Sequence, residues 1–180
     1  MKPTPAVLAA LAVVVVGFSA SSRIVAAPAS SSAGREATLG RLPPAAPAGE
    51  VVSYGHIKSL TRKGGRFEMR FDPAWWLSGV AASRAALEDT GSSDVPNDYY
   101  IVEEGHRLLT YVVAPTARVT VLTKRLRPMT ITVSELAQIV KGKNPKHRPL
   151  FDRSNSWGFW IRVGDKYPNP VLSLDQQYQP

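Results

Sequence analysis

The sequence contains no cysteine, and this absence removes several kinds of site at once. Without a thiol the chain has no disulfide, no cysteine nucleophile, no cysteine-ligated zinc and no lipid-modified cysteine. Its three histidines lie far apart, and no His-x-x-x-His pair is present. Neither a Gly-x-Ser-x-Gly elbow nor a Ser-x-x-Lys at an apolar helix start occurs. We therefore expect an apolar core to supply the stability, and we assign no catalytic residue, metal ligand or cofactor from these motifs.

The first 29 residues are predicted to be a secretion signal. Lys2 supplies a positive charge, Ala6–Val16 is an unbroken apolar run, and small residues follow it. This order is typical of a signal peptide, and Ala27-Pro28-Ala29 has the form of a cleavage site, with Ser19-Ala20-Ser21 as the alternative. The apolar run is shorter than the about 20 residues of a membrane span. The charge-free stretch Pro3–Ser22 is longer, so an uncleaved anchor is the alternative to a secreted bacterial protein that works outside the cytoplasm.

The sequence after the signal divides into a linker and a domain. Residues 30–50 are rich in Ala, Pro and Ser. Such a segment buries too little apolar surface to offset its ordering entropy, which predicts a flexible linker. The alternative is a loop packed on the domain through Leu39 and Leu42. Residues 51–180 are numerous enough to form a core, and we expect them to be one β-rich globular domain.

Strand patterns dominate the expected domain. Residues 51–60 and 66–71 are predicted to form a hairpin around the turn Lys63-Gly64-Gly65, with Phe67, Met69 and Phe71 on one face. Further strands are predicted at residues 99–102, 108–113, 118–123, 157–163 and 171–174.

Two helices are expected between these strands. Asp72-Pro73 provides an N-cap and a first helical position, which predicts a helix over residues 72–88. Its apolar stripe would hold Trp76, Leu77, Val80 and Leu87. The capping box Thr132–Glu135 predicts a second, short helix that ends near Gly142.

This order of elements predicts a mainly β fold with two short helices, in the α+β class. The short connections favour antiparallel pairing. We expect a small antiparallel barrel or half-open sheet of five to seven strands, with the first helix packed on it. An OB-like barrel is the closest named architecture, although its simplest form lacks the extra strands and the helix after the second strand.

Four segments of this domain resemble a group of small exported bacterial proteins of uncharacterised function. They are Gly55–Leu60, Phe71–Leu77, Asn97–Ile101 and Gln177–Pro180, and the resemblance extends over most of residues 51–180. It implies export and a single compact domain. The group has no activity or ligand that could be carried over, so the resemblance implies no chemistry.

Positive charge is the strongest functional signal, with a net charge of +8 at pH 7. A basic exported protein is attracted to anionic surfaces, although net charge also serves solubility alone. Trp160 alternates to the strand face opposite Phe159 and Ile161. If that face is open rather than covered by the first helix, aromatic and cationic side chains would suit sugar rings, anionic polymers or single-stranded nucleic acid. The predicted binding surface comprises Lys124, Arg125, Arg127, Lys141, Lys143, Lys146, Arg148, Trp160 and Arg162.

Acidic residues offer weaker hypotheses. Asp89–Asp98 concentrates oxygen donors that calcium prefers, but it lacks the EF-hand spacing, so we favour a solvated acidic loop. Glu103 and Glu104 are neighbours on a predicted strand and would point to opposite faces. They would therefore not converge as the two carboxyl groups of a glycosidase do.

We favour a non-catalytic binding or interaction module whose partner is an anionic cell-envelope polymer or another protein. The first alternative is a secreted hydrolase with an unrecognised site around His56, His106 or His147. The second is an inhibitor of an exported enzyme that presents the basic loop of residues 142–155. A deep pocket that holds a histidine beside a carboxylate and a hydroxyl would favour the enzyme. We expect no nucleotide cofactor, and no transmembrane domain after signal cleavage.

Overall fold

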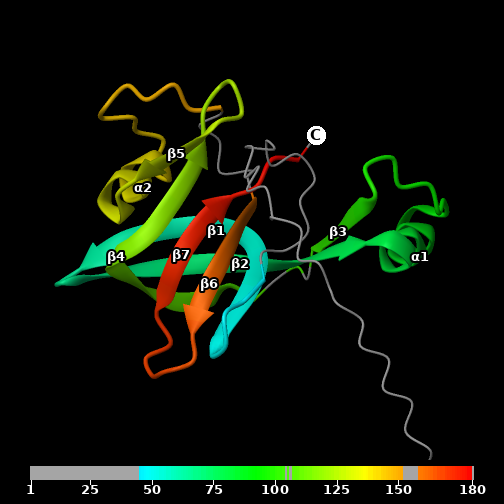
Figure 1. Ribbon diagram of the computed structural model, residues 1–180, viewed down its shortest axis with the longest axis horizontal. Helices are drawn as coiled ribbons and strands as arrows, with labels where there is room; N and C mark the ends of the chain where they lie inside the picture. The colour runs from blue at the N-terminus through cyan, green and yellow to red at the C-terminus, as the bar shows by residue number, and fades with distance from the viewer. Residues whose placement is uncertain (1–44, 104, 106, 152–157, 180) are drawn as a thin grey trace, which may run out of the picture. The chain divides into compact units, whose positions relative to one another are not determined.

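The computed structural model describes residues 45–103, 105, 107–151 and 158–179 (Figure 1). The predicted signal peptide and residues 30–44 of the predicted linker lie outside these residues, as do Glu104, His106 and residues 152–157. The described residues form seven strands and two helices. Along the chain these are β1 (Glu50–Lys63), β2 (Arg66–Ser78), α1 (Gly79–Thr90), β3 (Tyr99–Glu103), β4 (Leu109–Leu122), β5 (Pro128–Ile131), α2 (Val133–Ile139), β6 (Gly158–Gly164) and β7 (Val171–Gln176).

Five of these strands close into a barrel in the order β1-β2-β4-β7-β6, and β6 pairs back onto β1. Neighbouring strands are antiparallel except for β4 and β7, which run parallel. This closed order, with α2 between β4 and β6 along the chain, is that of an OB-like barrel. The predicted small β-rich barrel with two short helices is confirmed, and β3 and β5 are strands added to its outside.

Alternating side chains fill the barrel, as the period of two in the sequence predicts. Phe67, Met69 and Phe71 of β2 all point inward and are buried. On the opposite wall, β6 contributes Phe159 and Ile161 to the same apolar cluster. Helix α2 adds Val133, Leu136 and Ala137 to this cluster, and so covers part of the barrel. The remaining buried members of the cluster are Ile57, Leu60, Val113, Ala117, Val119, Val121, Ile131, Leu150, Val163, Val171 and Leu174.

The predicted start of the first helix at Asp72-Pro73 is wrong. Strand β2 continues through Pro73 to Ser78, and α1 begins only at Gly79. Proline is tolerated because β2 changes partner at this point: its pairing with β4 ends at Phe71, and its pairing with β3 begins at Ala74. Pro73 pairs with Gly55 of β1 on one edge, but on the other edge it lies between the β4 and β3 ladders. A proline is compatible with a strand where a ladder is interrupted in this way.

The far half of β2, together with β3 and α1, forms an arm attached to the barrel (Figure 1). Helix α1 packs its buried Ala82 and Ala86 on this two-stranded arm, and Val80 and Leu87 are exposed. The predicted stripe that joined these two residues to Trp76 does not exist, because Trp76 is part of β2. Gly91 ends the helix in a left-handed conformation, and its N–H donates to the Leu87 carbonyl.

Two further boundaries differ from the prediction. Residues 108–113 and 118–123 were expected to be separate strands, but both belong to the long strand β4. A register irregularity between Val113 and Arg118 lets β4 bend while it remains paired with β7. The short strand β5 was not predicted, because its opening Pro128 and its length of four residues give little periodic signal.

The inward face of β2 gives a first prediction. Phe71 is fully buried in the barrel, so Phe71→Ala removes a large side chain from a packed core. We expect it to lower the free energy of unfolding by about 3–5 kcal/mol, measured by urea denaturation. The control Val80→Ala changes a side chain that is 87% exposed on α1, and its cost should stay below about 0.5 kcal/mol. Equal effects of the two substitutions would contradict the described core.

Candidate functional site

Trp160 lies on the outer face of the barrel, as its strand position predicts, but it is only 7% exposed. The rings of Tyr54 and Trp76 pack against it, with ring centroids 4.9 Å and 5.8 Å away. Tyr99 of β3 stacks on the other side of Trp76 at 4.1 Å and nearly parallel. These four rings, which we call the aromatic cluster, join β1, β2, β3 and β6 outside the barrel core.

Residues after β7 satisfy the polar tips of this cluster. The indole N–H of Trp160 donates to Gln177 Oε1 at 3.2 Å, and the side-chain amide of Gln179 donates to the Tyr54 hydroxyl oxygen. Burial raises the pKa of the Tyr54 phenol far above its ordinary value, so the hydroxyl stays protonated at any physiological pH. Because these tips already have partners, the cluster presents mainly ring carbon to its surroundings.

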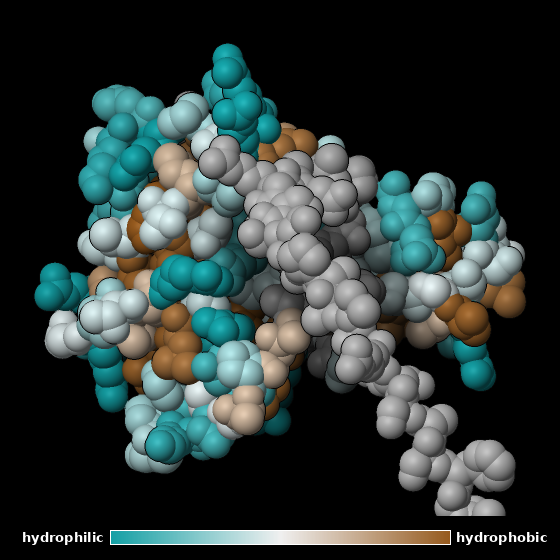
Figure 2. Space-filling model, in the orientation of Figure 1, coloured by the Kyte–Doolittle hydropathy of each residue, from teal (hydrophilic) through white to brown (hydrophobic). Residues whose placement is uncertain are grey.

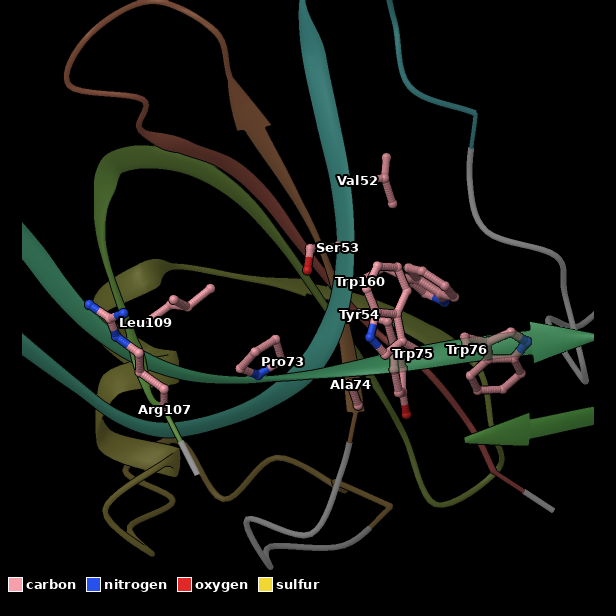
Figure 3. A pocket seen from close by; sticks show the side chains of 10 residues that line it. All are labelled: Val52, Ser53, Tyr54, Pro73, Ala74, Trp75, Trp76, Arg107, Leu109 and Trp160. Atoms are coloured by element: carbon pink, nitrogen blue, oxygen red, sulfur yellow. The ribbon is translucent and has the colours of Figure 1, made fainter. Parts of the chain in front are cut away.

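An apolar cleft opens beside the aromatic cluster, where β2 separates from β1 (Figure 3). Its volume is about 530 Å³, within the usual range of small-molecule sites. Trp75 is 58% exposed and stands at the opening. The only ionic group among the described lining residues is the guanidinium of Arg107, from the segment between β3 and β4. The full lining is Val52, Ser53, Tyr54, Pro73, Ala74, Trp75, Trp76, Arg107, Leu109 and Trp160.

The described histidines stand outside this cleft. His56 Nε2 lies 3.0 Å from Glu103 Oε1, and neither residue lines the cleft. His147 is exposed in the loop after α2, and His106 lies outside the described residues. Among its described lining residues, the cleft thus has no histidine beside a carboxylate, the arrangement that would favour the hydrolase hypothesis.

Two of the predicted surface cations instead hold a buried carboxylate. The Glu135 side chain is 3% exposed, and it accepts from Arg148 Nε at 2.8 Å and from Lys146 Nζ at 3.0 Å. The Thr132 hydroxyl accepts from the Glu135 N–H at 3.1 Å, which confirms the predicted cap. The Glu135 side chain does not complete the capping box. It ties the loop after α2 to the helix.

The residues of the predicted binding surface therefore fall into two groups, those held by other side chains and those that are exposed and unpaired among the described residues. Trp160 belongs to the aromatic cluster, and Arg162 is held by Ser173, at 2.9 Å, and by Glu50, at 3.4 Å. The remaining five cations are exposed, and none of them has an ion-pair partner among the described residues. We call these five the basic pole: Lys124, Arg125, Arg127, Lys141 and Lys143.

Backbone contacts join the two loops that carry the basic pole. The N–H of Lys124 donates to the Pro149 carbonyl at 2.8 Å, and Thr123 forms a β-bridge with Leu150. The turn after β4 and the loop after α2 are thereby fixed beside each other. Figure 2 shows hydrophilic residues gathered at this end of the barrel, which carries α2 and β5 in Figure 1.

The structure gives no support to a calcium site at Asp89–Asp98. Asp89 accepts a hydrogen bond from the Tyr100 hydroxyl at 2.5 Å. Across the described part of the chain, no three His, Asp or Glu side chains come together as a metal site would require. No helix within the described ranges is long and apolar enough to cross a bilayer.

Comparisons with known proteins assign no family to this arrangement. No protein-family model matches the chain, and neither the curated proteins nor the solved structures contain a match. The barrel, the cleft and the basic pole must therefore be interpreted from their own chemistry.

The buried Glu135 carboxylate generates a second prediction. Its hydrogen bonds from Arg148, reinforced by Lys146, outweigh the effect of burial and lower the pKa of Glu135 below its ordinary value. The folded state thus binds fewer protons here than the unfolded state, so this stabilisation is complete above the ordinary pKa of about 4.3. It is lost as the pH falls through the lower folded-state pKa.

We expect Glu135→Gln to flatten the loss of stability between neutral pH and about pH 3, measured by urea denaturation at a series of pH values. The matched control is Glu88→Gln, because Glu88 is exposed in an ion pair with Arg84 on α1. That variant should retain the wild-type pH profile. A wild-type profile for Glu135→Gln would show that the buried carboxylate contributes nothing specific to stability.

Proposed function

We propose that this protein is an exported, non-catalytic module that binds an anionic cell-envelope polymer through the basic pole. The observation that carries the proposal is the gathering of five exposed cations on two adjoining loops at one end of the barrel. Like charges repel one another, so such a cluster is stabilised when a polyanion neutralises it. The predicted signal peptide supports an extracytoplasmic location for this encounter.

The other cations of the predicted surface support this proposal indirectly. Glu135 holds Lys146 and Arg148, so the loop that carries Lys143 has a fixed conformation. Asn144 fixes the loop further, because its side chain bonds both the N–H and the carbonyl of Arg148. A loop that is ordered before binding loses less conformational entropy when a polymer docks.

The inhibitor hypothesis would use the same loop differently. An inhibitor needs a rigid protruding segment that enters another protein's cleft. The described part of this loop instead returns to the barrel edge, where the N–H of Phe151 donates to the Leu122 carbonyl. Its exposed positions include Lys143 and Lys146, and its phenylalanine, Phe151, packs edge-on against Tyr178 instead of forming the tip of a protruding loop, as the aromatic anchors of tight protein interfaces do. The polymer is therefore the partner that the side chains favour.

A third prediction tests this proposal with charge reversal. The variant Lys124→Glu/Lys143→Glu places two negative charges on the basic pole. We expect it to elute from a polyphosphate column at a much lower salt concentration than the wild-type protein. The wild-type protein should itself be released by moderate salt, since contacts between exposed charges are screened.

The matched control is Arg66→Glu/Lys166→Glu, which makes the same change of net charge. Arg66 follows the turn between β1 and β2, and Lys166 lies in the loop between β6 and β7, at the opposite end of those strands from the basic pole. If this control elutes as early as the pole variant, only net charge matters and the basic pole is not a site. Retention that ignores salt would also overturn the proposal.

A further inference from the structure

The cleft results from the change of partner along β2. Up to Ala74, β2 pairs with β1, and beyond that residue it pairs with β3 alone. On β1, Val52 and Ser53 therefore pair only with β6, and the space beside them is not closed by β2. Figure 3 shows Trp75 and Trp76 on β2 next to this space, with Leu109 and Arg107 across from them.

The walls of this cleft favour an apolar body over a sugar. The faces of Trp75 and Trp76, with Pro73, Leu109 and Val52, provide extensive carbon surface. A neutral sugar would need several hydrogen-bonding groups, because each hydroxyl that loses water must be satisfied. The polar tips of Tyr54 and Trp160 are already bonded to residues after β7. Few side-chain donors therefore remain for sugar hydroxyls.

Arg107 gives the cleft a charge preference. Its side chain is exposed, and none of the described carboxylates lies within ion-pair distance of it. The nearest described carboxylate along the chain, Glu103, is engaged with His56 at 3.0 Å. A planar guanidinium binds a carboxylate through two parallel hydrogen bonds, which fixes both orientation and charge.

We propose that this cleft binds an amphipathic monocarboxylate, a ligand with an apolar chain or ring system and one carboxylate group. The apolar body lies against Trp75, Pro73 and Leu109, and the carboxylate bonds to Arg107. Burial of the apolar body supplies the free energy of binding, and the guanidinium selects the anion. This site is separate from the basic pole and does not depend on the proposed polymer binding.

The experiment measures binding of dodecanoate below its micelle concentration, with dodecanol as the uncharged analogue and hexanoate as the short one. Trp75, Trp76 and Trp160 all line the cleft, so tryptophan fluorescence reports occupancy, and calorimetry gives an independent Kd. We expect saturable binding of dodecanoate with a blue shift. Dodecanol and hexanoate should each bind at least tenfold more weakly than dodecanoate. Dodecanol lacks the carboxylate that bonds to Arg107, and hexanoate buries fewer methylene groups.

Two variants separate the roles of the cleft residues. Arg107→Gln should weaken dodecanoate about tenfold and leave dodecanol unchanged, whereas Arg107→Lys should retain part of the preference for the anion. Trp75→Ala should weaken both ligands, measured by calorimetry. Trp75 is exposed, so circular dichroism should show an unchanged fold.

The control is Arg66→Gln, which removes an exposed positive charge from the start of β2 and should not change the binding of either ligand. The pole variant Lys124→Glu/Lys143→Glu should also bind dodecanoate normally, so failure of the polymer proposal and failure of this one are distinguishable. Equal binding of dodecanoate and dodecanol by the wild-type protein would overturn the assignment to Arg107. Absence of saturable binding for either ligand would overturn the site itself.

Discussion

Strand β2 carries the constraint on which the rest of the structure depends. Its first half pairs with β4 and closes the barrel, and its second half leaves β4 and pairs with β3. One strand must therefore serve a closed barrel and an open arm in succession. Pro73 stands at the change of partner from β4 to β3, and a strand tolerates proline where a ladder is interrupted. The cleft beside β1 is a direct geometric consequence of this arrangement.

A close crossing at Gly55 makes this path of β2 possible. Gly55 pairs with Pro73, and a side chain at this position would overlap the Asp72 carbonyl and the Phe71 ring. The absence of a Cβ thus allows Phe71 to fill the barrel while the next residues turn outward. Asp72, whose sequence position predicts a helix cap, instead pairs with Lys58 at 2.8 Å on the outer face. Asp72 and Pro73 have the sequence pattern of a helix start, but they form part of a strand because β1 pairs with them.

The alternation of apolar residues is what made the barrel predictable from the sequence. Phe67, Met69 and Phe71 face inward as expected, and so do Phe159 and Ile161, because a period of two is a local property of the chain. The predicted helix at Asp72 is wrong because pairing of β2 with β1 and β3 outweighed the local cap chemistry, and this pairing is a tertiary contact that the local pattern does not reveal. The strand order of the barrel is also non-local, and only a general resemblance to OB-like barrels could be inferred.

The candidate sites were also predictable only in part, because the sequence shows residue types but not the contacts between distant residues. The exposed cations of the basic pole are visible in the sequence, but their separation from Lys146 and Arg148 depends on Glu135, which the sequence marked only as a capping residue. The cleft was missed, because residues 72–88, which include Trp75 and Trp76, were expected to form a helix. A single signal could have found it: the tryptophan pair Trp75-Trp76, which follows Pro73 directly after the alternating pattern of a strand.

The polarity of the cleft depends on residues that do not line it. Gln177 accepts the Trp160 N–H, and Gln179 donates to the Tyr54 hydroxyl, so the polar tips of both rings have partners within the protein. Without these partners the two polar tips would need water or ligand groups, and the same four-ring cluster would favour a polar ligand. The segment after β7 therefore makes the cleft favour an apolar ligand, because it bonds the polar groups of the aromatic cluster. Arg107, on a different segment, sets the charge preference independently.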